Sequence, residues 1–144
     1  MDHISAGRRS ENMRRIQAEN TRPELAVRSA LHRMGFRFRP HATALPGKPD
    51  LVLKRFNLAV FVHGCFWHCH GCKRGNACPK SNVSYWQQKL KRNVERDAHN
   101  LQQLRHLGWR CLVVWECETN NPSRLRKRLQ TVMTRFGNSP PHTL

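Results

Sequence analysis

The sequence predicts a small α/β fold with a mixed central sheet, in the order helix, three strands, helix, strand, helix. Apolar residues recur at helical spacing in three segments, and short runs rich in Val and Leu lie between them. Two of these runs, "DLVLK" and "LAVFV", are separated by only a few residues, which indicates an antiparallel hairpin. A long helical segment separates the third and fourth strands, and this favours a right-handed parallel crossover.

The first helix begins at Thr21. "TRPE" places Pro23 in the first turn and Glu24 three residues after the Thr21 cap, which is typical of a capping box. Gly35 ends the helix. The alternating "FRFRP" that follows predicts a strand, and "LPGKP" predicts a turn before the hairpin.

The second half of the chain predicts a helix, a strand and a helix. The long helix begins near Ser84 and Gly108 closes it, and "WRCLVVWEC" after it is short and rich in Val and Trp, as strands are. Ser123 is expected to cap the last helix, which Gly137 ends. The inward side chains of the long helix repeat at helical spacing: Trp86, Leu90, Val94, Leu101, Leu104 and Leu107.

A chain of 144 residues predicts one domain. We expect a basic N-terminal arm at residues 1–20, a single domain at residues 21–137 and a flexible C-terminal tail at residues 138–144. We expect a monomer.

The charge predicts an anionic partner. The chain has 26 Lys and Arg against 9 acidic residues, a net charge of +17 and a pI near 11.2. Nucleic acid is the first candidate. A membrane is the alternative, but the sequence has no apolar span of about 18 residues and no signal peptide. We therefore expect a cytoplasmic protein whose six cysteines are thiols or metal ligands.

Asp50 and His63 are candidates for chemistry at the sheet edge. Asp50 opens one strand of the hairpin and His63 ends the other, so the two side chains can be neighbours. A carboxylate is a hard oxygen ligand suited to Mg²⁺, and the carbonyl of Val62 can be another. The alternative for Asp50 is a turn residue that caps its neighbours.

Proton transfer has its candidates in His63 and His68. Phosphodiester hydrolysis needs an activated water and a protonated leaving group. Either histidine can instead be a zinc ligand or a surface residue. Asp97, on the expected inner side of the long helix, is costly there without a partner and can orient an imidazole. Its alternative is a pair with Arg96 or Lys91.

A cluster of thiols and imidazole has the spacing of a zinc site. It comprises Cys65, Cys69, His70, Cys72 and Cys78. A local set of Cys65, Cys69, Cys72 and Cys78 competes with a set that includes Cys117 from the end of the last strand.

Three aromatic residues lie beside this cluster: Phe66, Trp67 and Trp86. Aromatic side chains on a basic surface can stack on bases or wedge between them. The alternative for Trp86 is packing against the cysteine loop.

Several segments closely resemble the very-short-patch repair endonucleases, the Vsr family. "HGCFWH" and "NVERD" are the most specific, and the resemblance covers roughly residues 8–120. The segments are "NMRRI", "ELAVRSAL", "LPGKPDLVL", "FVHGCFWHCHGC", "PKSNVSYW", "KRNVERD" and "LGWRCLVVWEC".

The resemblance implies a restriction-endonuclease-like core with a structural zinc loop. It implies a Mg²⁺-dependent nick in double-stranded DNA, 5′ of the thymine in T·G mispairs that arise by deamination of 5-methylcytosine. Other repair proteins are implied as partners. Two alternatives remain: a related restriction endonuclease that cuts matched DNA, and a zinc-stabilised DNA-binding module without catalysis.

The resemblance also implies roles for individual residues. Asp50 resembles the Mg²⁺ carboxylate, with the Val62 carbonyl beside it. His63 and His68 resemble the catalytic histidines, Asp97 the support of His68, and Glu24 the acidic residue of the first helix. The implied zinc ligands are Cys65, His70, Cys72 and Cys117. The implied DNA contacts are the wedge of Phe66, Trp67 and Trp86 and the arm at Met13, Arg14 and Arg15.

Overall fold

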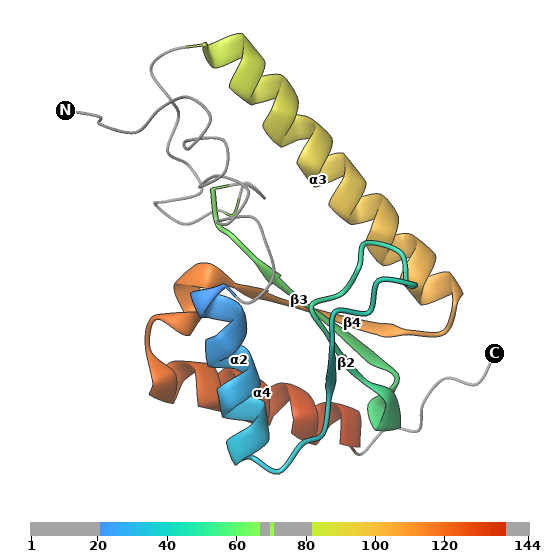
Figure 1. The fold of residues 1–144 in the computed structure, drawn as a ribbon, viewed down its shortest axis with the longest axis vertical. Helices are drawn as coiled ribbons and strands as arrows, with labels where there is room; N and C mark the ends of the chain where they lie inside the picture. The colour runs from blue at the N-terminus through green and yellow to red at the C-terminus, as the bar shows by residue number, and fades with distance from the viewer. Residues whose placement is uncertain (1–20, 67–69, 71–81, 138–144) are drawn as a thin grey trace.

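The computed structural model describes residues 21–66, 70 and 82–137 (Figure 1). The elements are α2 (Arg22–Arg33), β1 (Arg39–Pro40), β2 (Leu51–Leu53), β3 (Leu58–His63), α3 (Val83–His106), β4 (Arg110–Trp115) and α4 (Pro122–Gly137). Two 3-10 turns join them, η1 (Lys54–Phe56) and η2 (Glu116–Thr119). The predictions for the basic arm, the C-terminal tail, Trp67, His68, Cys69, Cys72 and Cys78 lie outside the described residues.

The four strands form a mixed sheet in the order β1-β2-β3-β4, so the predicted mixed α/β class is confirmed. β1, β2 and β3 pair antiparallel, and β3 and β4 pair parallel across the α3 crossover. The hairpin between β2 and β3 turns through η1, where Asn57 adopts a φ of 48°, a left-handed conformation that Asn tolerates.

Helices cover both faces of the sheet. Leu58 and Val60 of β3 pack with α2 and α4, whereas Ala59 and Phe61 pack with Leu104 of α3. This alternation follows from the two-residue period of a strand. Figure 1 shows α2 and α4 lying together, with α3 apart from them beyond β4.

The predicted cap of the first helix is confirmed. The Thr21 hydroxyl accepts a hydrogen bond from the backbone N–H of Glu24 at 3.4 Å, and a proline lies in the first turn. Gly35 follows the helix with a φ of 86°, as its predicted role at the C-terminus requires. The cap fixes the position of Glu24, whose side chain is buried.

The predicted first strand is too long, and the predicted cap of the last helix is wrong. Of the strand expected across "FRFRP", only Arg39–Pro40 forms, because β1 pairs with the short strand β2 through two residues. Phe36 and Phe38 instead pack on the core. α4 begins at Pro122, and the cap is Asn121, whose side-chain oxygen accepts from the N–H of Ser123 at 3.0 Å and of Arg124 at 3.2 Å.

α3 buries less of its predicted face than expected. Val94 is 41% exposed and Leu107 is 55% exposed, so their predicted inward orientation is wrong. For Val94 the reason is that α3 is longer than the sheet it crosses, and only its C-terminal part packs on β4 (Figure 1). Leu107 is the C-cap residue, just past the last helical residue, so the helical spacing no longer sets its direction. None of the described helices is long and apolar enough to cross a membrane.

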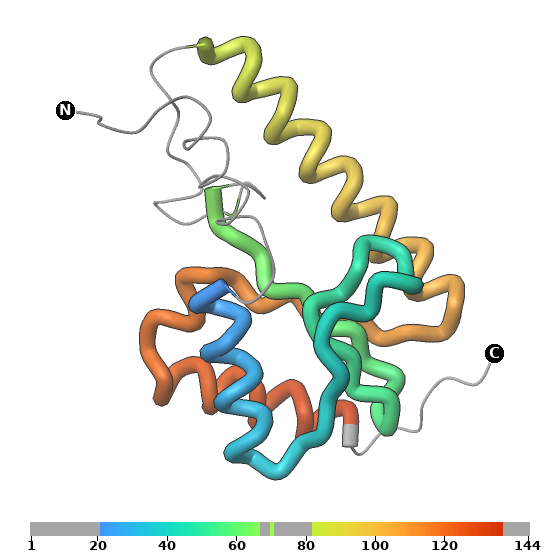
Figure 2. The backbone as a smooth tube through the Cα atoms, in the orientation of Figure 1, coloured from blue at the N-terminus to red at the C-terminus, as the bar shows by residue number. Residues whose placement is uncertain are grey.

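Figure 2 shows the chain between β1 and β2 reaching across toward the second half of α3. Gly47 makes this approach possible. Its φ is 75°, and a Cβ added there would lie 2.9 Å from the Cβ of Asn100. A residue without a side chain is required where the chain comes this close to the side chain of Asn100.

Candidate active site

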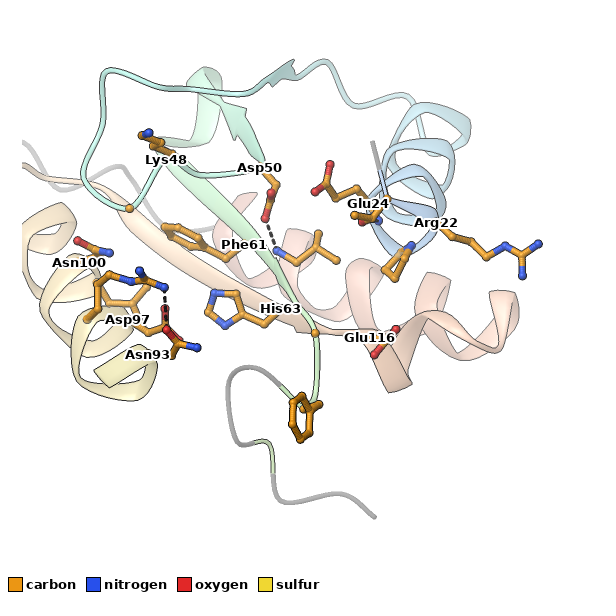
Figure 3. A pocket seen from close by; sticks show the side chains of 18 of the residues that line it. Arg22, Glu24, Lys48, Asp50, Phe61, His63, Asn93, Asp97, Asn100 and Glu116 are labelled. Atoms are coloured by element: carbon orange, nitrogen blue, oxygen red, sulfur yellow. Dashed lines mark hydrogen bonds between the residues drawn. The ribbon is translucent and has the colours of Figure 1, made fainter. Parts of the chain in front are cut away.

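A cleft of about 1100 Å³ lies where β3 ends (Figure 3). Its walls come from the start of α2, the turn before β2, the exit of β3 and the inner side of α3. Four of the residues predicted to take part in catalysis line it: Glu24, Asp50, His63 and Asp97. These four come from four different elements or turns, so only the folded chain brings them together.

Asp50 is held by the neighbouring strand. The backbone N–H of Val62 in β3 donates to Oδ2 of Asp50 at 2.6 Å. The predicted placement of Asp50 beside the end of β3 is therefore what the structure has. Figure 3 shows the carboxylates of Asp50 and Glu24 directed toward the same space.

Burial raises the pKa of Asp50 from 3.8 to about 7. The N–H of Val62 opposes this shift, Glu24 adds to it by repulsion and hydrogen bonding, and Arg28 opposes it with its positive charge. Two carboxylates in a partly dry space are costly unless a proton or a cation joins them. The oxygen donors therefore fit a divalent metal such as Mg²⁺.

Glu24 belongs to a network that the sequence analysis did not find. Nη2 of Arg28 lies 3.3 Å from Oε2 of Glu24 and 2.7 Å from Nε2 of His41. The N–H of His41 donates to the carbonyl of Asp50 at 3.0 Å. The spacing of Glu24 and Arg28, four residues apart on a helix, was a usable signal. His41 gave none, because its contact is made only in the fold.

His63 ends β3 inside the cleft and is 7% exposed. Its ring lies 5.6 Å from that of Phe61 and 5.4 Å from that of Trp115, measured between centroids. Figure 3 shows it facing the α3 side chains of Asn93 and Asp97. Arg96, which with Lys91 was the alternative partner predicted for Asp97, donates to Oδ1 of Asn93 at 3.1 Å.

A group of possible metal ligands lies directly beyond His63. The ligand atoms of Cys65, His70 and Cys117 all lie within 4.8 Å of one another. Sγ of Cys117 is 3.5 Å from Nδ1 of His70, and the N–H of Cys117 donates to Sγ of Cys65 at 3.4 Å. The sequence left two ligand sets open. The structure brings Cys65 and His70 together with Cys117, as the set that includes Cys117 requires.

Two of the predicted aromatic residues, Phe66 and Trp86, contact each other beside the cleft. The rings of Phe66 and Trp86 meet edge to face at 5.7 Å, and Phe66 lines the cleft. Sequence reasoning missed two neighbours here. Tyr85, 57% exposed, lies 5.4 Å from Trp86, and Nζ of Lys89 lies 5.7 Å from the Trp86 ring.

Two carboxylates and a histidine in one cleft at the edge of a mixed sheet, in a chain this basic, fit phosphodiester cleavage. The class is a nuclease.

Comparison with known proteins agrees. The Vsr family, described as DNA mismatch endonuclease Vsr, matches residues 1–74. The type II nicking enzyme V.XorIIP of Xanthomonas oryzae pv. oryzae is 46% identical over 92% of this chain and 96% of its own length. The DNA mismatch endonuclease Vsr of Escherichia coli is 40% identical over 81% and 74%, and the type II nicking enzyme V.NaeI of Lentzea aerocolonigenes 44% over 80% and 70%. The chain belongs to the Vsr family of DNA mismatch endonucleases. It is an endodeoxyribonuclease, and DNA is its substrate.

Proposed function

We propose that this endonuclease nicks duplex DNA 5′ of the thymine in T·G mispairs, with Mg²⁺, in very short patch repair. The observation that carries the proposal is the cleft in which Asp50, Glu24 and His63 meet beside Phe66 and Trp86. A cutting site and an aromatic surface then act on the same few nucleotides. We also propose that the fold is a restriction-endonuclease-like core formed by residues 21–137, with residues 1–20 as a DNA-binding arm.

Asp50 and the carbonyl of Val62 would hold Mg²⁺, which supplies charge neutralisation and lowers the pKa of a bound water. His63 and His68 transfer protons at the attacking water and the leaving oxygen. Asp97 orients His68, and Glu24 keeps a second negative charge beside Asp50. The raised pKa of Asp50 supports this assignment, because a carboxylate held this way gains most from a cation.

Zinc would be held by Cys65, His70, Cys72 and Cys117. The approach of Cys65, His70 and Cys117 supports this set. Soft thiolates with an imidazole suit Zn²⁺ in a closed, structural site. Such a site fixes the loop that carries Phe66, Trp67 and His68, and so links the wedge to the proton-transfer residues.

Selection of the mispair is proposed to rest on Phe66, Trp67 and Trp86. Inserting a ring between base pairs costs a few kcal/mol of unstacking. The cost is lower at a T·G wobble, because a mispair is more easily distorted than a T·A pair. The Phe66–Trp86 contact supports an aromatic surface beside the cleft.

The test is the rate of nicking on paired T·G and T·A duplexes, in several sequence contexts, with Mg²⁺ as the divalent ion. Wild type nicks T·G, and Trp67→Ala loses most of that rate while it keeps zinc and non-specific DNA binding. Equal cutting of T·A duplex would instead identify a restriction enzyme. Binding without nicking would identify a DNA-binding module.

Metal assignments are tested separately. Asp50→Ala should abolish nicking and keep DNA binding. Metal analysis should find one zinc per chain, lost in Cys117→Ala and Cys72→Ala and kept in Cys78→Ala. Zinc retained in Cys117→Ala and lost in Cys78→Ala would reverse the ligand set.

A further inference from the structure

We propose that Trp115 is a positioning residue that couples the Cys65–His70–Cys117 cluster to His63. The inference deepens the proposed function and rests on it for the roles of His63 and of the metal. In this proposal Trp115 contacts neither DNA nor the metal.

The coupling begins with the register of two parallel strands. His63 of β3 is directly paired with Trp115 of β4. Both strands end at these residues, and two residues later in the chain come Cys65 and Cys117, the latter in η2. The N–H of Cys117 donates to Sγ of Cys65 at 3.4 Å, so the two cysteines lie together directly past the paired ends of β3 and β4.

The ring of Trp115 contacts two histidines, one on each side of this junction. Trp115 stacks on His70 with centroids 4.2 Å apart and an interplanar angle of 12°. It also meets His63 edge to face at 5.4 Å and 73°. Phe61 contacts His63 at 5.6 Å. The indole thus touches an imidazole of the metal cluster and the imidazole of the cleft.

This arrangement lets the metal act on His63 through Trp115. A metal fixes the plane of His70, because Nδ1 of His70 lies 3.5 Å from Sγ of Cys117 within the ligand group. A fixed His70 plane fixes the indole stacked on it. The indole in turn limits the rotation of His63, which a proton-transfer residue needs in order to meet its target within hydrogen-bond reach.

The backbone of Trp115 is held independently of its ring. Its N–H donates to Oε1 of Glu118 at 3.0 Å, and Oε2 of Glu118 accepts from Nε of Arg128 at 3.0 Å. The strand pairing with β3 is also a backbone contact. Replacement of the ring therefore leaves the strand and Cys117 in place.

The experiment compares Trp115→Leu, which removes the aromatic plane, with Trp115→Phe, which keeps one. Trp109→Leu is the matched control, because Trp109 comes just before β4 and packs with Ala59, Phe61 and Leu104 at the opposite end of that strand. Each full-length zinc protein is assayed for bound zinc, for kcat and KM on T·G duplex, and for its histidine imidazole signals by NMR. Cadmium then replaces zinc, which changes ligand distances without emptying the site.

Trp115→Leu should keep its zinc and its KM and lose kcat on the order of 10-fold to 100-fold, as misplacement of a reacting group does. Trp115→Phe should recover most of kcat, and Trp109→Leu should retain it. Exchange of zinc for cadmium should shift the His63 signal in wild type and in Trp115→Phe but not in Trp115→Leu.

Loss of zinc together with activity in Trp115→Leu would make Trp115 a packing residue of the metal site and overturn the proposal. Wild-type kcat in Trp115→Leu, or a His63 signal that responds to cadmium without the indole, would also overturn it. Failure of wild type to nick T·G duplex would refute the proposed function instead. In that case the cadmium response of His63 still decides the coupling.

Discussion

Asp50, the proposed Mg²⁺ ligand, opposes folding when its buried carboxylate is ionised. Its carboxylate is buried beside Glu24, and its pKa rises to about 7 as a result. In the unfolded chain the same group titrates near 3.8. Folded Asp50 therefore binds its proton more tightly than unfolded Asp50, and the stability that it contributes falls as the pH rises between these two values.

Asp50→Asn should stabilise the protein at pH 8 and not at pH 4, when no magnesium is added. Asn keeps an acceptor for the N–H of Val62 and never carries the buried charge. The gain in unfolding free energy at pH 8 should be on the order of 1 kcal/mol or more. Urea unfolding at both pH values measures it, and the variant should have no nicking activity. Glu95→Gln, an exposed carboxylate on α3, controls for charge alone. Equal effects of Asp50→Asn at pH 4 and pH 8 would refute this account.

Arg28 is the cation that makes Glu24 tolerable. The two side chains are 17% and 7% exposed, and they lie 3.3 Å apart. Arg28→Met leaves a buried carboxylate without this cation and should lower the unfolding free energy by about 1–3 kcal/mol. The double variant Glu24→Gln/Arg28→Met should lose clearly less than the sum of the single variants, because the charge itself is gone. Additive losses would show that the two residues act independently.

At the scale of elements, the features that could be predicted from the sequence are those set by local patterns. The hairpin, the parallel crossover and the α2 cap follow from local patterns and are observed. Val94 could not be placed, because helical spacing does not tell how far α3 extends past the sheet. The Arg28–His41 contact is absent from any local pattern, since it joins α2 to the turn before β2. Asp50 and His63 could be predicted as neighbours because they belong to one hairpin. The contact of Trp115 with His63 could not be predicted, because it depends on the register between β3 and β4.

The turn before β2 is fixed against α3 through Gly47, and this contact can be isolated by a matched pair of variants. Gly47 and Gly35 have φ values of 75° and 86°, so alanine at either position is strained, by about 1–2 kcal/mol. A Cβ on Gly35 meets nothing within 4 Å, whereas a Cβ on Gly47 meets the Cβ of Asn100 at 2.9 Å.

Gly47→Ala should therefore lower the melting temperature more than Gly35→Ala does. Adding Asn100→Ala should not relieve the Gly47→Ala loss fully, because the nearest atom is a Cβ that alanine keeps, while Asn100→Gly should relieve more of it. Gly47→Ala should also lower kcat, since the turn carries Lys48 and Asp50 into the cleft. Equal melting temperatures for the Gly47→Ala and Gly35→Ala variants would mean that the turn moves away from Asn100 without a loss of stability.

At the scale of the whole molecule, charge decides how the enzyme meets DNA. With a net charge of +17 on 144 residues, the cations repel one another, and this repulsion falls when phosphates are bound. The cations are spread over the chain. The cleft is lined by Arg22, Lys48, Lys89 and Arg96, and α4 carries a separate exposed set on the face of the sheet opposite α3. Only cations that touch phosphate release counterions, so salt dependence can tell these groups apart.

The arm at residues 1–20 should belong to the phosphate-binding group. Replacing Arg8, Arg9, Arg14 and Arg15 with Gln should weaken duplex binding. It should also lower the slope of log affinity against log salt by up to about 0.9 for each arginine that contacts a phosphate. The matched control replaces four exposed cations of α4, namely Arg124, Arg126, Lys127 and Arg135. It removes the same charge from the helix layer opposite α3, so it should reduce long-range attraction but leave the slope nearly unchanged. Fluorescence titrations of a T·G duplex between low and moderate salt measure both slopes. An equal drop in the two variants would mean that the arm acts only through net charge, and a drop in the α4 variant alone would place the DNA against the opposite layer.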